Sequence, residues 1–218
     1  MHDVNLKVFD FDYDLTWWAF LIDANERVYS RFGGSGDADP ASRLSVTGLK
    51  YTMHLVLKEH ELHRKNAPPA HVEVVRPMDL FGMKGKCMHC HQVNENFYKL
   101  EKPKPKATDL GRLRFLPIPE DLGITLSIDA GNRVEKVAKN SPAERAGLRP
   151  GDMLRNIGTT QTNSQGDVMW AMKSAPKEGS LPVTIARASG PMELSIELLR
   201  GWNKPDLSWR RSISKLKK

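Results

Sequence analysis

Hydrophobic and polar residues follow two different periods along the first 65 residues. Residues 6–13 alternate apolar and acidic side chains at a period of two, which predicts a half-buried strand. Residues 16–23 are almost continuously apolar, and residues 27–34 follow after a short turn, so these two segments predict a hairpin that closes on two glycines. Residues 37–65 open with Asp and Pro and then carry apolar residues at helical spacing, which predicts an amphipathic helix.

From about residue 109 the pattern changes to short strands, turns and two helical segments. Five strand-length segments carry the apolar residues: 122–128, 132–137, 152–158, 181–187 and 192–199. Residues 141–152 predict a short helix that ends at Gly147, and residues 164–175 predict a second helix with Ser164 as its N-cap. The region therefore predicts a small domain of mixed strands and helices.

The segment between these two regions, residues 66–108, shows only weak periodicity. Pro and Lys alternate near its end, a composition that favours an extended, solvated linker. Both cysteines of the chain lie in this segment, so the linker is also the first place to look for chemistry.

The two cysteines and the histidine after them have the spacing of a c-type haem attachment site. Cys87 and Cys90 would form thioether bonds and His91 would ligate the iron, which makes haem c the first candidate cofactor. The candidates for the sixth iron ligand are Met78, Met83, His71 or a His of the preceding predicted helix. The segment contains few large apolar side chains, so a haem would need cover from the flanking regions.

The same residues also suit other chemistry. A Cys-x-x-Cys loop lowers the pKa of its first thiol, so the pair could act as a dithiol and disulfide. Zn²⁺ could be held by the two thiolates together with one or two of His71, His89 and His91. A loop with no cofactor is the remaining alternative. Haem, thiol pair, metal and no cofactor all stay open at this point.

The net charge of +7 is concentrated at the end of the chain. From residue 200 onward seven basic residues accompany a single acid, Asp206, which leaves a charge of only +1 for residues 1–199. A nearly neutral body gives no electrostatic reason to bind a polyanion, so we expect no nucleic-acid partner. In the tail, Trp209, Ile213 and Leu216 fall on one helical stripe, which suits weak contact with an anionic membrane surface or a loosely packed tail.

The N-terminal region is acidic where an export signal would be basic. The chain starts with alternating acidic residues instead of a basic start and an apolar core, so we expect no signal peptide in this sequence. The longest apolar run, residues 17–22, is too short to span a bilayer. Asp10, Asp12 and Asp14 alternate along the first predicted strand and would share one face, where they would be solvated or bind Ca²⁺.

Residues 109–200 resemble a PDZ domain of the type found in bacterial HtrA-like proteins. The resemblance rests on the segments DLGITL, NRVEKVAKNSPAERAGLRPGDMLRNIG and DVMWAMKSAPKEGSLPVTIAR, in that order. It implies a partly open β-barrel with two helices. It also implies a protein or peptide segment as partner, added as an extra strand with its carboxylate in a nest of backbone amides.

The resemblance also implies which residues bind the peptide. They are Leu122, Gly123, Ile124, Thr125, Leu126, Gln165 and Met169. Leu122, Gly123 and Ile124 would offer the backbone amides that hold the carboxylate. Ile124, Thr125 and Leu126 would form the edge that pairs with the peptide. Gln165 and Met169 would face the ligand's side chains. Gln165 stands where one specificity class has His, so no preference for Ser or Thr follows. Glu120 and Asp121 would repel a free carboxylate, which favours an internal or intramolecular segment as ligand.

Residues 4–64 are similar to the last two strands and the final helix of a thioredoxin-like domain. The similarity rests on TWWAFLIDANERVYSRFGG followed by the amphipathic helix. The strand and helix that carry the redox motif in that fold are missing, and Leu15 and Thr16 stand where its cis-proline is expected. The sheet would then have an uncovered edge, so we expect the chain to be N-terminally incomplete.

The order of these parts, together with the ending RGWNKPDLSWRRS, resembles the bacterial thioredoxin-like/PDZ (seleno)protein family. Some members of that family carry selenocysteine in the half that is missing here. A selenocysteine codon read as a stop would make a gene begin downstream and lose its export signal. The resemblance therefore implies a periplasmic or otherwise extracytoplasmic full-length protein.

We thus expect an α+β chain in four parts. They are a partial thioredoxin-like α/β unit (1–64), the Cys-x-x-Cys-His segment and linker (65–108), a PDZ domain (109–200) and a basic tail (201–218). The expected function is redox-associated: the PDZ domain recruits a polypeptide, and a c-type haem transfers electrons. The alternative is a PDZ adaptor without haem, whose cysteine segment is a metal site or a thiol pair. No complete catalytic constellation is visible, so we expect a thiol–disulfide oxidoreductase only if an upstream half supplies the redox motif.

Overall fold

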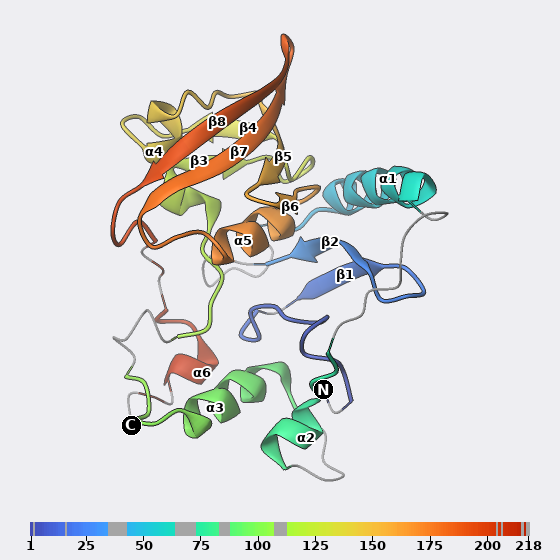
Figure 1. The fold of residues 1–218 in the computed structure, drawn as a ribbon, viewed down its shortest axis with the longest axis vertical. Helices are drawn as coiled ribbons and strands as arrows, with labels where there is room; N and C mark the ends of the chain where they lie inside the picture. The colour runs from blue at the N-terminus through green and yellow to red at the C-terminus, as the bar shows by residue number, and fades with distance from the viewer. Residues whose placement is uncertain are drawn as a thin grey trace.

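The computed structural model describes residues 1, 3–15, 17–34, 43–63, 73–82, 88–106, 113–203, 205, 207–214 and 216. Its elements are arranged along one long axis (Figure 1). The strands of the C-terminal region lie at one end, and a hairpin with a long helix lies in the middle. The other end, near both termini, holds the helices α2 (Pro77–Phe81), α3 (Cys90–Leu100) and α6 (Arg211–Ser214).

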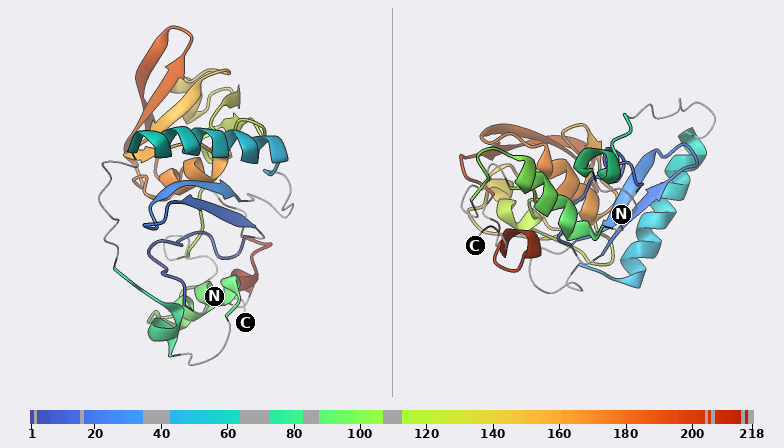
Figure 2. Two further views of the ribbon diagram at one scale, coloured as in Figure 1. Left: turned by 90° about the vertical axis from the view of Figure 1, so that its right-hand side faces the viewer. Right: turned by 90° about the horizontal axis from the view of Figure 1, so that it is seen from below.

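The predicted hairpin and the helix after it are confirmed. β1 (Trp18–Ile22) pairs antiparallel with β2 (Val28–Gly33), with Ala19 opposite Phe32, and α1 (Val46–His63) follows. α1 packs against β2, and so does α5 (Gln165–Lys173) of the C-terminal region. Both helices lie on the side of the hairpin that faces the C-terminal sheets (Figures 1 and 2).

Residues 6–13 do not form the predicted strand and instead make a series of turns. Side chains in this stretch bond to the nearby backbone. Asn5 Oδ1 accepts from the amides of Lys7 and Val75 at 3.0 and 3.1 Å, and Asp12 Oδ1 accepts from the amide of Asp14 at 3.3 Å. Local bonds of this kind compete with a strand ladder, which explains why the alternating pattern misled the prediction.

The C-terminal region contains two open sheets. Its strands are β3 (Ile124–Leu126), β4 (Val134–Val137), β5 (Met153–Ile157), β6 (Thr160–Gln161), β7 (Gly179–Arg187) and β8 (Gly190–Leu198). β3 pairs with β4, and the other sheet has the order β6-β5-β7-β8. The partly open barrel implied by the resemblance is seen here as two open sheets, which an isolated bridge between Arg133 and Met153 and backbone hydrogen bonds from Val134 to Asp152 and from Leu154 to Asn132 connect. The five predicted strands are confirmed, whereas the two-residue β6 left no pattern to detect.

The helices of this region begin where the sequence predicted. Ser141 caps α4 (Pro142–Arg145) by accepting from the amide of Glu144 at 3.1 Å, and Ser164 caps α5 by accepting from the amide of Asp167 at 3.0 Å. Between the helices and sheets lies a core whose fully buried members include Leu122, Ile124, Leu154, Val168, Met172, Ile185, Ile196 and Leu198. Each such side chain stabilises the fold by about 1.5–3 kcal/mol relative to its exposed state.

Residues 90–100 form a helix, although the sequence predicted an extended linker. Helix α3 buries Val93 and Tyr98 together with the polar Asn94 and Glu95. Its residues Cys90, Val93 and Phe97 recur at helical spacing and share one cluster, a signal that the prediction missed. The basic tail packs on this helix, since Ile213 is buried in a cluster with Tyr98. The expectation of a loose tail is therefore wrong for its described residues.

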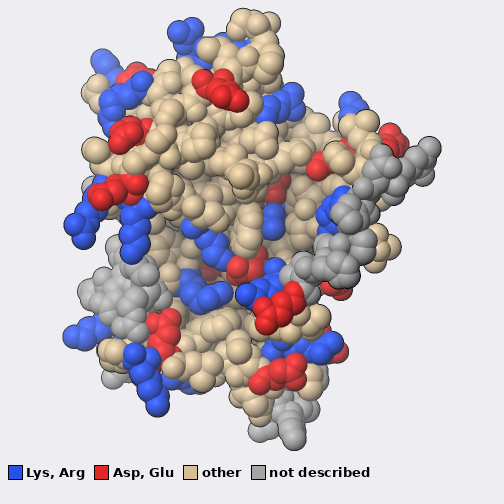
Figure 3. Space-filling model, in the orientation of Figure 1, with Lys and Arg blue, Asp and Glu red and all other residues tan. Residues whose placement is uncertain are grey.

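The surface agrees with the nearly neutral body inferred from the sequence. Basic and acidic side chains are interspersed over the face shown in Figure 3. Among the described helices, none is both long enough and apolar enough to cross a bilayer.

Candidate functional site

The candidate site lies along the outer edge of β3. Within the described residues, β3 pairs only with β4. The carbonyl of Gly123 accepts from the amide of Ala138 at 2.7 Å, and the amide of Ser127 donates to the carbonyl of Arg133 at 2.9 Å. Because backbone groups alternate sides along a strand, Ile124 and Leu126 direct their N–H and C=O groups away from β4. This edge can therefore accept another strand.

The turn before β3 has a fixed conformation. The short helix η2 (Pro119–Leu122) ends at Gly123, whose φ of 80° lies in the left-handed region that favours glycine. A Cβ atom at Gly123 would overlap the Cβ of Ser141 and lie 2.6 Å from its Oγ. The amide of Gly123 donates to the carbonyl of Glu120 at 2.9 Å. One of the three amides predicted to hold a ligand carboxylate is thus already engaged by the turn.

A cavity of about 320 Å³ borders β3 and joins it to the start of α5. Its lining residues are Arg43, Glu120, Thr125, Leu126, Ile128, Glu135 and Gln165. The structure therefore brings Thr125 and Leu126 together with Gln165, as predicted. Two carboxylates and one guanidinium line the cavity, so its net charge is negative.

Met169 does not line this cavity. Its side chain is fully buried, and a Cβ atom at Gly34, just after β2, would lie 3.1 Å from the Met169 Sδ. The hairpin of the same chain covers this part of α5. The prediction that Met169 faces a ligand is therefore wrong for this arrangement, and the open part of the groove is its Gln165 end.

Arg43 bridges the two walls of the cavity, a role that the sequence did not reveal. Its guanidinium donates to both carboxylate oxygens of Glu120, at 2.7 and 3.2 Å, and to Gln165 Oε1 at 3.1 Å. The Arg43 side chain is only 10% exposed. Glu120, which the sequence marked as repelling a carboxylate, here binds a cation from the same chain. No local signal pointed to this contact, because the two residues are 77 positions apart.

The hairpin holds the N-terminal end of α5 through Asp167. This buried carboxylate accepts from Ser30 Oγ at 2.6 Å, from the amide of Arg31 at 2.8 Å and from the amide of Asn163 at 3.0 Å. Burial raises the pKa of Asp167 to about 6, while these donors oppose the rise. The hydroxyl of Ser164 also donates to the carbonyl of Arg31. The helix that forms one wall of the groove is thus fixed to β2.

Helix α1 supports the other side of the region. Polar contacts between α1 and the C-terminal region include Tyr51 Oη to Asn132 at 3.0 Å and the Glu59 carboxylate to Gln161 and Asn163 at 2.8 and 3.1 Å. Just before the helix, Ser45 Oγ donates to Asp129 at 2.7 Å. A Cβ atom at Gly48 would overlap the carbonyl oxygen of Ile128, so glycine permits this close approach. Arg43 therefore reaches the cavity from a well-anchored segment.

The cysteine motif is described only in part. Cys90 starts α3 and is partly buried, and His91 Nε2 lies 3.8 Å from Glu95 Oε1. Met78 lies in α2. Cys87, Met83 and His71 lie outside the described residues. Among the residues that the structure describes, no three His, Cys, Asp or Glu side chains are grouped as metal ligands.

The three aspartates of the N-terminal region neither share a solvated face nor form a calcium site. Asp12 is buried against Arg210, and Asp14 accepts from Ser212 and from Asn94 Nδ2. Asp10 pairs with Lys173 at 2.5 Å. Asp12 and Asp14 therefore both tie the C-terminal tail to the N-terminal turns, and Asp10 ties the end of α5 to them.

Comparisons with known proteins agree with the geometry of β3 and α5. Residues 120–198 match the PDZ domain family. A comparison with curated proteins found no match. Among solved structures, the chain is similar to the serine endoprotease from Yersinia pestis, with 26% identity, a TM-score of 0.31 and coverage of 35% of this chain and 27% of that one.

Two further structures of HtrA-type proteins are similar to part of this chain. The PDZ domain of HtrA3, bound to a phage-derived ligand FGRWV, is 24% identical with a TM-score of 0.28, covering 38% of this chain and 78% of that one. An HtrA-type protease with a decapeptide is 18% identical with a TM-score of 0.35, covering 45% and 33%. The family match over residues 120–198 shows that the chain contains a PDZ domain, while the thioredoxin-like interpretation of residues 1–64 stays a prediction.

Proposed function

We propose that the PDZ domain binds a partner polypeptide as an extra strand along β3. The observation that carries the proposal is the direction of the Ile124 and Leu126 backbone groups, which point away from β4 along an edge that borders a cavity. Main-chain hydrogen bonds along such an edge supply affinity, and the cavity selects side chains. Thr125 and Gln165 line this cavity and would contact the side chains of the ligand.

The ligand is an internal segment with a basic side chain and not a free C-terminus. The amide of Gly123 is engaged by the turn, and Glu120 and Glu135 line the cavity, so a ligand carboxylate would meet like charge. The contact of Arg43 supports a basic ligand side chain, since its guanidinium makes a bidentate contact with the Glu120 carboxylate. A ligand Arg or Lys would replace Arg43 at that carboxylate.

Peptides selected from a random phage-displayed library against the full chain provide the probe for this function. Each selected peptide is labelled and titrated by fluorescence anisotropy as the free acid, as the C-terminal amide and with its basic residue changed to Ala. We expect acid and amide to bind alike and the Ala change to weaken binding about tenfold, the effect of losing one charge-assisted hydrogen bond.

The variant Glu120→Gln removes the carboxylate that would receive the basic residue. The Ala change in the peptide should then have little effect, whereas the exposed-site control Glu193→Gln should behave like the wild-type chain. Binding that requires a free carboxylate would contradict the ligand class. A library that yields no binder to any form of the chain would contradict the peptide-binding function itself.

We also propose a second activity, in which Cys87, Cys90 and His91 hold a c-type haem. The supporting observation is the apolar cover around Cys90, which packs with Phe11, Phe81 and Phe97 on a buried cluster of Leu6, Tyr13, Met88 and Val93. Leu6, Phe11 and Tyr13 come from the N-terminal region, so they would supply part of the flanking cover that a haem needs. When bound, the haem would supply one-electron transfer, and the chain would contribute the two thioether links and the axial His91.

The haem proposal is tested by the pyridine haemochrome spectrum of protein made with a haem-ligation system. A c-type spectrum that persists after denaturation and is lost in Cys90→Ser would support it. A colourless protein with two free thiols, or with one equivalent of zinc, would favour the alternative of a PDZ adaptor with a thiol pair or a metal site. The peptide titration is independent of this outcome.

A further inference from the structure

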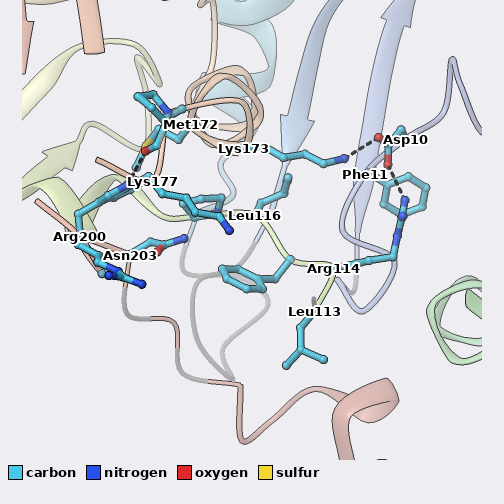
Figure 4. A pocket seen from close by; sticks show the side chains of 16 residues that line it. Asp10, Phe11, Leu113, Arg114, Leu116, Met172, Lys173, Lys177, Arg200 and Asn203 are labelled. Atoms are coloured by element: carbon cyan, nitrogen blue, oxygen red, sulfur yellow. Dashed lines mark hydrogen bonds and ion pairs between the residues drawn. The ribbon is translucent and has the colours of Figure 1, made fainter. Parts of the chain in front are cut away.

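A second cavity, of about 550 Å³, lies at the opposite end of α5 from Gln165 (Figure 4). Four separate segments form it: the N-terminal turns, residues 113–117, the end of α5 with residues 175–177, and residues 200–203 after β8. Helix α5 has nine residues, so the two cavities are separated by roughly 13 Å along its axis. This cavity is therefore a different site from the groove beside β3.

The two ends of the cavity differ in charge. At one end Asp10 lies 2.5 Å from Lys173 and 3.6 Å from Arg114, so these charges are largely balanced. Lys177 and Arg200 lie on the other side (Figure 4), and within the described residues neither forms an ion pair. Four cations and one carboxylate line the cavity, which leaves an excess of positive charge at the Lys177 and Arg200 end.

The walls between these two ends are apolar. Phe115, Leu116 and Met172 line the cavity, and Leu116 and Met172 are nearly inaccessible to solvent. Trp202 also lines it, and its indole Nε1 donates to the carbonyl of Pro176 at 3.0 Å, which fixes the orientation of the ring. The cavity thus combines fixed aromatic and aliphatic walls with two cations, at one end, to which no described residue gives an ion pair.

We propose that this cavity binds a small amphipathic anion, whose apolar body lies along Phe115 and Trp202 and whose anionic head meets Lys177 and Arg200. The size is within the roughly 300–1,000 Å³ range of small-molecule sites, which are mostly apolar with a few placed polar groups. A single carboxylate, sulfonate or phosphate head matches the two cations. The Asp10 carboxylate at the far end disfavours a second negative group there.

The test uses two fluorescent probes with the same apolar body. 8-Anilinonaphthalene-1-sulfonate carries an anionic head, and N-phenyl-1-naphthylamine lacks it. We expect the sulfonate to bind the full chain with one-to-one stoichiometry and about tenfold more tightly than the neutral probe, with an affinity that falls as salt is added. Quenching of tryptophan fluorescence by bound sulfonate is expected from Trp202.

Two charge-removing variants locate the site. Arg200→Gln and Lys177→Gln should each weaken the sulfonate about threefold without changing the affinity of the neutral probe, because only the head contacts these exposed residues. Lys139→Gln, at an exposed cation elsewhere in the PDZ domain, is the matched control and should have no effect. All three positions are exposed, so the variants should keep the wild-type unfolding midpoint.

Two results would overturn the proposal. One is equal affinity of the wild-type chain for both probes, and the other is sulfonate binding that neither Arg200→Gln nor Lys177→Gln weakens. Because the peptide groove lies at the other end of α5, either result would leave the peptide titrations unaffected.

Discussion

The guanidinium of Arg210 lies against the carboxylate of Asp12, 198 residues away in the sequence, and both side chains are buried. Burial raises the pKa of Asp12, and the positive charge of Arg210 opposes that rise. The amide of Leu116 donates to the same carboxylate at 3.2 Å. The tail, the N-terminal turns and the segment that enters the PDZ domain thus meet at one ion pair.

Removing Arg210 should strongly destabilise the chain. Arg210→Ala leaves Asp12 buried without its cation, and breaking a buried pair in this way costs about 3–5 kcal/mol of the free energy of unfolding. Urea unfolding measures the change. The exposed neighbour Arg211→Ala is the control and should change stability by less than about 0.5 kcal/mol. Equal effects of the two substitutions would show that the ion pair does not anchor the tail.

The stability of the chain should depend on pH through Asp167. Its folded-state pKa of about 6 is above the ordinary aspartate value of 3.8, so folding favours its protonated form. This contribution is fully present below about pH 4 and is lost as pH rises through 6. Relative to Asp167→Asn, the wild-type chain should gain about 1 kcal/mol in free energy of unfolding when pH falls from 7 to 5. If the free energy of unfolding changed equally in the wild-type chain and in Asp167→Asn between pH 7 and 5, the raised pKa of the buried Asp167 carboxylate would be contradicted.

Gly123 should tolerate no side chain, because two effects act against it. Gly123→Ala places a Cβ in a left-handed conformation and also against Ser141, so we expect a loss of about 3 kcal/mol in thermal or urea unfolding. Gly158 has a φ of 56° with open space around it, so Gly158→Ala isolates the conformational effect and should cost about 1 kcal/mol. A similar loss at both positions would mean that contact with Ser141 is unimportant.

Arg43 should compete with the peptide ligand. Arg43→Ala removes the guanidinium that binds Glu120 and Gln165, so a selected peptide with a basic residue should bind about fivefold more tightly by fluorescence anisotropy. Lys50→Ala, an exposed cation on α1, is the control and should leave the affinity unchanged. Weaker binding by Arg43→Ala would instead make Arg43 part of the ligand site.

Sequence patterns predicted the elements of this fold well where the signal was local. A continuous apolar run followed by a turn predicted the hairpin in which Ala19 lies opposite Phe32. Ser164 likewise predicted the start of α5, which it caps. The contacts that shape the site were not predictable. Arg43 reaches Glu120 across 77 positions and Asp12 reaches Arg210 across 198, and nothing in the residues near either partner indicates the other.

Other errors arose where one local signal outweighed another, or where distant segments pack together. Cys90, Val93 and Phe97 of helix α3 recur at helical spacing, but the alternating Pro and Lys residues after this helix favoured an extended linker instead. The cover of Met169 by the residues after β2 depends on packing between distant segments, since Asp167 accepts bonds from Ser30 and Arg31. The PDZ pattern predicted the groove beside α5, but the hairpin of the same chain covers the part of that groove at Met169.

Hydrogen exchange of single amides tests the central claim most directly, because strand addition along β3 assigns each amide a direction. On saturation with a selected peptide, NMR-detected exchange should slow at Ile124 and Leu126, whose amides point away from β4, and should stay unchanged at Thr125, which already pairs with Lys136. Saturating binding that leaves the exchange of both Ile124 and Leu126 unaltered would contradict it.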